Sequence, residues 1–166
     1  MITLVLGGTR SGKSEVAERL AGDGGDPVTY VATGRATDDD MAARIARHQA
    51  RRPPTWPTVE AVGDLPALLT RLQGSVLVDS LGTWLAADPG LAVPTADLCA
   101  ALCGRGGDTV VVSEEVGLGV HAPTEVGRRF ADALGTLNRA VADVADRVLL
   151  VVAGRVLPLN RVESGT

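Results

Sequence analysis

The chain opens with MITLVLGGTRSGKS, residues 1–14, and this stretch decides the fold. An apolar run that ends at Leu6 is typical of a buried strand, and the pattern G-x-x-x-x-G-K-[ST] follows it directly. Glycines let the backbone curl so that successive N–H groups point at phosphate oxygens, and a following helix adds its positive end. The sequence therefore predicts a phosphate-binding P-loop between a strand and a helix. The alternative is a glycine-rich turn that binds nothing.

The P-loop pattern also predicts how the phosphates and a magnesium ion are held. Lys13 is expected to reach the β- and γ-phosphates, and the Ser14 hydroxyl is expected to bind Mg²⁺. Asp79 ends the apolar run SVLVD and is expected to share that ion, because ligands bind where the strands of open α/β sheets end. A strand-end acid that caps the next turn is the alternative for Asp79. The nucleotide contacts predicted within the motif are Gly7, Gly8, Thr9, Arg10, Ser11, Gly12, Lys13 and Ser14.

Beyond the P-loop, short valine-rich runs alternate with helical patterns, which is typical of buried parallel strands joined by crossover helices. Strands are expected at residues 1–6, 28–32, 58–60, 75–79, 109–113, 147–153 and 155–159. Helices are expected at residues 13–21, 38–51, 64–72, 95–103 and 124–145. We therefore predict one α/β domain over residues 1–166. Its expected architecture is a RecA-like P-loop NTPase, a three-layer sandwich with a mainly parallel sheet and a C-terminal hairpin.

The composition excludes several classes of function. A net charge of −4 argues against nucleic-acid binding, which requires a basic surface. Two cysteines, Cys99 and Cys103, form neither a metal pattern nor a disulfide framework, so a reducing cytoplasm is expected. The start of the chain lacks the pattern of a signal peptide, and no apolar run reaches the roughly 18 residues of a membrane span.

One histidine lies in a helical pattern. Met41, Ile45 and His48 share one face of the helix expected at residues 38–51. A histidine beside apolar residues is more often packed than catalytic, so the spacing alone leaves the role of His48 open. Arg51 and Arg52 can likewise be solvated charges that favour the negative end of the helix dipole.

Four stretches together resemble one enzyme family. They are GGTRSGKS (7–14), YVATGRATDDDMAARIARHQARRPPTW (30–56), VVVSEEVGLGV (110–120) and GRRFADALGTLNRAVADVADRVLLVVAG (127–154). They resemble the bifunctional adenosylcobinamide kinase and adenosylcobinamide-phosphate guanylyltransferase family of cobalamin biosynthesis. The resemblance covers nearly the whole chain, and residues 38–56 are its most specific part.

The resemblance implies that His48 is the residue that becomes guanylylated. A neutral imidazole attacks the α-phosphate of GTP, expels pyrophosphate and holds GMP as a phosphoramidate, and nearby arginines favour the neutral form. Glu60 is a candidate acceptor for the guanine N–H groups, with a surface acid at a strand edge as the alternative. The further nucleotide contacts implied by the resemblance are Thr33, Gly34, Arg35, Gln49, Ala50, Arg51, Arg52, Glu60 and Asp79.

The segment at the end of the strand expected at 109–113 departs from the family. Glu114 stands where the family reads Asn before Glu-Val-Gly, which leaves open how this loop meets the substrate. Glu115 is a candidate for the kinase step, as a base or through Mg²⁺, with a solvated loop carboxylate as the alternative. His121 is interpreted as a loop residue.

The predicted enzyme phosphorylates adenosylcobinamide with ATP or GTP and then transfers GMP from GTP to that phosphate. The resemblance also implies a homo-oligomer, a trimer, with the corrinoid bound between subunits. A P-loop kinase of another metabolite, in which His48 is structural, is one alternative. A nucleotide-dependent binding module that hydrolyses slowly is another.

Overall fold

The computed structural model describes residues 1–24, 27–34, 46, 50–61, 63–119 and 122–162. The strands are β1 (Ile2–Gly7), β2 (Val28–Ala32), β3 (Thr58–Glu60), β4 (Ser75–Asp79), β5 (Thr109–Glu114), β6 (Arg147–Val152) and β7 (Arg155–Pro158). The helices are α1 (Lys13–Gly22), α3 (Leu65–Arg71), α4 (Leu81–Ala86), α5 (Thr95–Gly104) and α6 (Glu125–Val144).

The strands form one sheet in the order β3-β2-β4-β5-β1-β6-β7, and only β7 runs antiparallel to its neighbour. The parallel strands therefore end along one side of the sheet, which we call the carboxyl edge. Gly7 at the end of β1 lies opposite Glu114 of β5, and Asp79 of β4 lies opposite Val112 of β5. The register thus brings the P-loop, the end of β5 and the end of β4 side by side.

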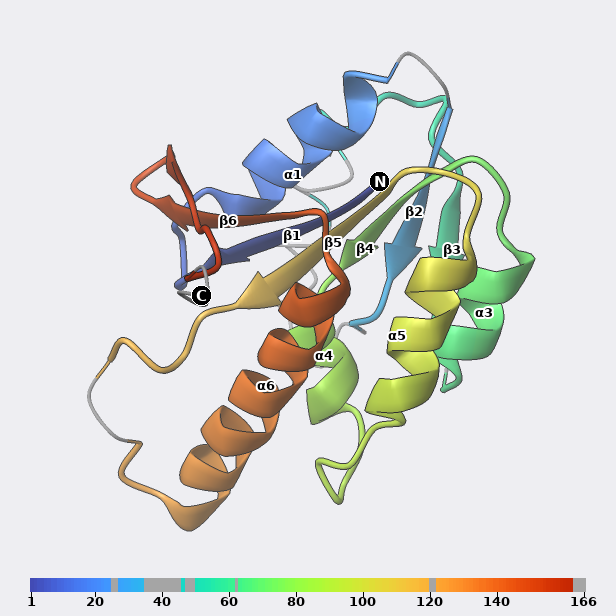
Figure 1. Ribbon diagram of the computed structural model, residues 1–166. Helices are drawn as coiled ribbons and strands as arrows, with labels where there is room; N and C mark the ends of the chain where they lie inside the picture. Colours follow the sequence, from blue (N-terminus) through green and yellow to red (C-terminus); the bar gives the residue numbers. More distant parts are fainter. Residues whose placement is uncertain (25–26, 35–45, 47–49, 62, 120–121, 163–166) are drawn as a thin grey trace.

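Helices cover both faces of the sheet, as Figure 1 shows, with α1 on one face and α3, α4, α5 and α6 on the other. Alternate strand residues supply the two cores. Val5 and Leu77 pack with Ala17 of α1, whereas Leu4 and Val78 belong to the core beneath the other helices. The predicted three-layer sandwich with a mainly parallel sheet is confirmed.

The C-terminal hairpin is also confirmed. The turn between β6 and β7 consists of Ala153 (φ 50°) and Gly154 (φ 72°), and two positive φ angles suit the right-handed twist of a two-residue hairpin. The Gly154 N–H donates to the Ser11 carbonyl at 2.8 Å, so this turn braces the P-loop from the side of β6.

Helix α4 was not predicted from the sequence. It spans only Leu81–Ala86, too short for a periodic pattern, and it is specified instead by a capping box between Ser80 and Thr83. Most of the helix predicted at residues 38–51 lies outside the described residues. Among the residues that the structure does describe, no helix is long and apolar enough to cross a membrane.

Candidate active site

The P-loop has the backbone shape that the motif predicts. Arg10 (φ 57°) and Gly12 (φ 92°) are left-handed, and the Ser11 N–H donates to the Gly8 carbonyl at 3.2 Å. A Cβ on Gly7 would collide with the Ser11 hydroxyl and would lie 2.9 Å from the Val151 carbonyl, so only glycine fits there. The loop curls tightly into the first turn of α1, where N–H groups have no helical acceptor.

Lys13 is buried at the bottom of this loop, with 4% of its side chain exposed. Its Nζ donates to the Gly8 carbonyl at 3.4 Å and lies 3.6 Å from Glu114 Oε1. A buried ammonium group needs compensating charge or hydrogen bonds, and both contacts supply this. Lys13 is therefore fixed beside the space that a phosphate group of a bound nucleotide would enter.

Glu114 ends β5 and turns its carboxylate toward Lys13 and the start of α4. The Ser80 hydroxyl donates to both carboxylate oxygens at 3.1 Å, and Asn138 Nδ2 donates to the Glu114 carbonyl at 3.0 Å. The Glu115 carboxylate instead accepts the Gly117 N–H at 2.7 Å. Of the two adjacent acids, Glu114 is the one that contacts the P-loop lysine.

A set of hydroxyl groups joins the ends of β2 and β4. Thr33 Oγ1 donates to the Ser80 carbonyl at 2.6 Å and accepts the Ser80 N–H at 2.8 Å. Thr83 Oγ1 lies 3.2 Å from the Ser80 hydroxyl. A Cβ on Gly34 would lie 3.4 Å from Thr83, so the predicted contacts Thr33 and Gly34 sit beside the beginning of α4.

Asp79 faces Tyr30 of β2 at the same edge. The Tyr30 hydroxyl donates to Asp79 Oδ2 at 2.9 Å. Burial, followed by the charge of Asp79 and this hydrogen bond, raises the pKa of Tyr30 far above its ordinary value, although the Arg52 guanidinium opposes the shift. That guanidinium lies 3.5 Å from the centroid of the Tyr30 ring, and it donates to Thr58 Oγ1 at 3.3 Å. Tyr30 thus connects two of the predicted site residues, Asp79 and Arg52.

Arg51 pairs with Glu18 of α1 at 3.3 Å, so the chain just after position 48 is tied to the helix that follows the P-loop. Ala50 is exposed, and Glu60 is an exposed residue at the end of β3, opposite Ala32. The predicted site residues Arg35, His48 and Gln49, and also His121, lie outside the described residues.

Sequence reasoning missed several residues that hold the predicted ones in place, namely Glu18, Tyr30, Ser80, Thr83 and Asn138. Only the spacing of Ser80 and Thr83 could have been noticed, as a capping pair after a strand. The others depend on which strands and helices become neighbours.

The donor set at the carboxyl edge suits a magnesium ion. In the part of the chain that the structure describes, no three His, Cys, Asp or Glu side chains form a metal cage. A P-loop site does not require one, because Mg²⁺ there takes one or two protein oxygens together with phosphates and water. The Ser14 hydroxyl at the start of α1 and the Asp79 carboxylate offer oxygen ligands of this kind.

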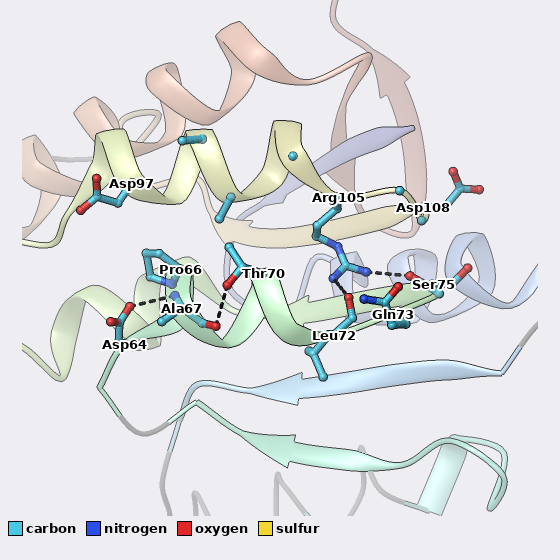
Figure 2. A pocket seen from close by; sticks show the side chains of 16 residues that line it. Asp64, Pro66, Ala67, Thr70, Leu72, Gln73, Ser75, Asp97, Arg105 and Asp108 are labelled. Carbon is cyan, nitrogen blue, oxygen red and sulfur yellow. Dashed lines mark hydrogen bonds between the residues drawn. The ribbon is translucent and has the colours of Figure 1, made fainter.

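A large hollow lies away from these residues, between α3 and α5 (Figure 2). It has a volume of about 1020 Å³ and reaches Ser75 and Asp108, where β4 and β5 begin. Arg105 crosses one end of it and donates to the carbonyls of Leu69, Leu72 and Gly74. Burial lowers the pKa of Arg105, but its bonds are structural ones that clamp α5 to α3.

Comparison with known proteins identifies relatives along nearly the whole chain. Residues 3–159 match the family model described as cobinamide kinase / cobinamide phosphate guanyltransferase. The bifunctional adenosylcobalamin biosynthesis protein CobP of Pseudomonas aeruginosa is 42% identical, over 96% of this chain and 98% of that protein. The bifunctional adenosylcobalamin biosynthesis protein CobU of Escherichia coli is 35% identical, over 93% of this chain and 97% of that protein.

Solved structures confirm the fold class. An ATPase from a bacterial type III secretion system aligns with a TM-score of 0.56 and 12% identity over 90% of this chain, which spans half of that ATPase. The flagellar accessory protein FlaH of Methanocaldococcus jannaschii aligns with a TM-score of 0.50 and 15% identity over 93% of this chain and 74% of FlaH. At these identities, the likeness shows the fold alone.

Proposed function

The chain belongs to the cobinamide kinase / cobinamide phosphate guanyltransferase family, and from this premise we propose the chemistry of its two reactions. It is an enzyme, so the alternative of a binding module falls away. The observation that carries the proposal is a family match over residues 3–159, which includes both the P-loop and His48.

The first proposed reaction moves the γ-phosphoryl group of ATP or GTP to the aminopropanol hydroxyl of adenosylcobinamide. The P-loop N–H groups and Lys13 hold the phosphates, and the buried position of Lys13 supports this role. Ser14 and Asp79 would hold Mg²⁺, which when bound neutralises phosphate charge. The remaining work of the protein is to orient the two reactants and keep them in line.

The second proposed reaction runs through His48. An imidazole nitrogen forms a bond to the α-phosphorus of GTP, the bond from that phosphorus to the bridging oxygen breaks, and pyrophosphate leaves. A phosphate oxygen of adenosylcobinamide phosphate then attacks the same phosphorus. The P–N bond breaks, the imidazole departs, and adenosylcobinamide-GDP is formed.

Residues close to position 48 support a nucleotide site at this end of the sheet. Arg51 is paired with Glu18 of α1, and Arg52 stacks on Tyr30, which bonds Asp79. The segment after His48 is therefore tied directly to the helix that follows the P-loop and, through Tyr30, to Asp79, the residue proposed for Mg²⁺. We propose further nucleotide contacts at Thr33, Gly34, Arg35, Gln49, Ala50 and Glu60.

We also propose that the enzyme is a cytoplasmic homo-oligomer, a trimer, that binds its corrinoid substrate between subunits. The location follows from the use of ATP and GTP as substrates. Exposed apolar side chains on the C-terminal hairpin support assembly: Val152 (59% exposed) and Leu157 (56%) lie on one face of β6 and β7, and Val156 (46%) lies on the other.

The direct test is a product assay by mass spectrometry with adenosylcobinamide, ATP and GTP. We expect the phosphate ester with either nucleotide alone and the GDP derivative only when GTP is present. Lys13→Ala should reduce phosphorylation by about 10² to 10³-fold. His48→Ala should stop at the phosphate ester. Formation of the GDP derivative by His48→Ala would contradict the proposed second step.

A further inference from the structure

A carboxylate stands beside the phosphate-binding lysine, and neither reaction proposed above uses it. Glu114 Oε1 lies 3.6 Å from Lys13 Nζ, and 27% of the Glu114 side chain is exposed. Lys13 itself is almost completely buried. The Lys13 ammonium group, which is expected to bind phosphate, is therefore paired with a carboxylate that solvent and ligands can reach.

The position of this carboxylate is fixed by its surroundings. Ser80 donates its hydroxyl hydrogen to Glu114, and Ser80 is buried and bonded to Thr33 and Thr83. Asn138 holds the Glu114 carbonyl. A side chain on Gly82 would collide with the same carboxylate, so α4 begins with a residue that leaves room for it. Because these contacts fix Glu114, it cannot move far when a phosphate approaches.

A fixed carboxylate at this point changes the electrostatics of nucleotide binding. A γ-phosphate that reaches Lys13 must replace Glu114 as the partner of the ammonium group, and it then lies close to a second anion. Two anions that contact the same ammonium group repel each other strongly in a site of reduced dielectric constant. A bound Mg²⁺ removes two of the negative charges of the nucleotide, and so the metal-free nucleotide experiences the greater repulsion.

We propose that Glu114 is a fixed counter-ion of Lys13, which the phosphates replace as the partner of the ammonium group, and that its remaining charge makes the site select the Mg²⁺ complex of a nucleotide over the metal-free nucleotide. The inference rests on the proposed role of the P-loop in binding nucleotide. It adds a specificity-determining residue to that site.

The test is the dissociation constant of GTP, measured by calorimetry with its α,β-methylene analogue, which cannot release pyrophosphate to His48. It is measured for the native chain and for Glu114→Gln, once with Mg²⁺ and once with a chelator. Without metal, Glu114→Gln should bind GTP about tenfold more tightly than the native chain. With Mg²⁺, the two constants should agree within about threefold. Glu15→Gln is the matched control, since it removes the same charge from the first turn of α1 at an exposed site. Its constants should equal those of the native chain.

Equal affinities of Glu114→Gln and the native chain for metal-free GTP would overturn the inference. Weaker binding of Mg²⁺-GTP by Glu114→Gln would overturn it as well, because Glu114 would then act as a ligand of the metal. Glu114→Asn must reproduce the result, which guards against a packing defect specific to glutamine. A native chain that binds GTP under neither condition would refute the proposed function together with the inference.

Discussion

At the scale of single residues, the titration of the Tyr30 hydroxyl reports directly on its contact with Asp79. It is the one tyrosine of the chain, so its titration can be followed by absorbance without interference from another. Burial first, and then the Asp79 carboxylate, raise the pKa of its hydroxyl. The pKa of Tyr30 in the folded state exceeds the unfolded value of about 10. The contribution of Tyr30 to the free energy of unfolding is therefore fully present below about pH 10, and it is lost as the pH rises further.

We therefore expect native protein to show no tyrosinate absorbance until the chain unfolds in alkali, while protein in denaturant titrates near pH 10. Circular dichroism recorded on the same samples separates titration from unfolding. Tyrosinate that appears near pH 10 while the helix signal is intact would contradict the buried bond to Asp79.

Gly7 tests the shape of the P-loop. A Cβ at this position would collide with the Ser11 hydroxyl and approach the Val151 carbonyl, so the loop must move in Gly7→Ala. We expect GTP binding at least about tenfold weaker, measured by calorimetry. Gly135→Ala on α6 makes the same change in open space and should retain native affinity. Unchanged binding by Gly7→Ala would show that the loop described here is not the phosphate site.

At the scale of elements, packing of buried leucines stabilises α6 against the face of the sheet opposite α1. Leu134 and Leu137 are fully buried in the larger core, whereas Val126 at the start of the helix is 67% exposed. Leu137→Ala should lower the free energy of unfolding by about 2–5 kcal/mol, because it removes packed atoms and leaves a cavity. Val126→Ala should change it by less than about 0.5 kcal/mol. Denaturant unfolding of both variants measures the difference.

Elements with strong local signals could be predicted from the sequence, and those defined by distant contacts could not. The strands at 28–32, 58–60 and 75–79 agree with the structure residue for residue. The predicted limits of α6 included its two capping residues, Thr124 and Ala145. Helix α4 escaped prediction because six residues show no period. The pairs Lys13–Glu114 and Tyr30–Asp79 escaped it because they depend on strand order, with β5 between β1 and β4 and with β2 beside β4.

At the scale of the whole molecule, the proposal of a homo-oligomer rests on the edge of the sheet at β7. All four residues of β7 are exposed, and two of them, Val156 and Leu157, are apolar side chains available for a contact between chains. We expect the native chain to have the mass of a trimer by light scattering, and Leu157→Glu to shift it toward the monomer. A monomeric native chain at micromolar concentration would contradict the proposal. The single-domain organisation stays a prediction at this scale.

The central claim is that one chain carries both a P-loop kinase site and a histidine that becomes guanylylated. The intact mass of the protein after incubation with GTP and Mg²⁺, beside a His48→Ala variant, tests it most directly. The account predicts a mass increase equal to one GMP on the native chain, absent from the variant and absent when ATP replaces GTP. No adduct on a native chain that demonstrably binds GTP would contradict the covalent step and leave His48 without a catalytic role.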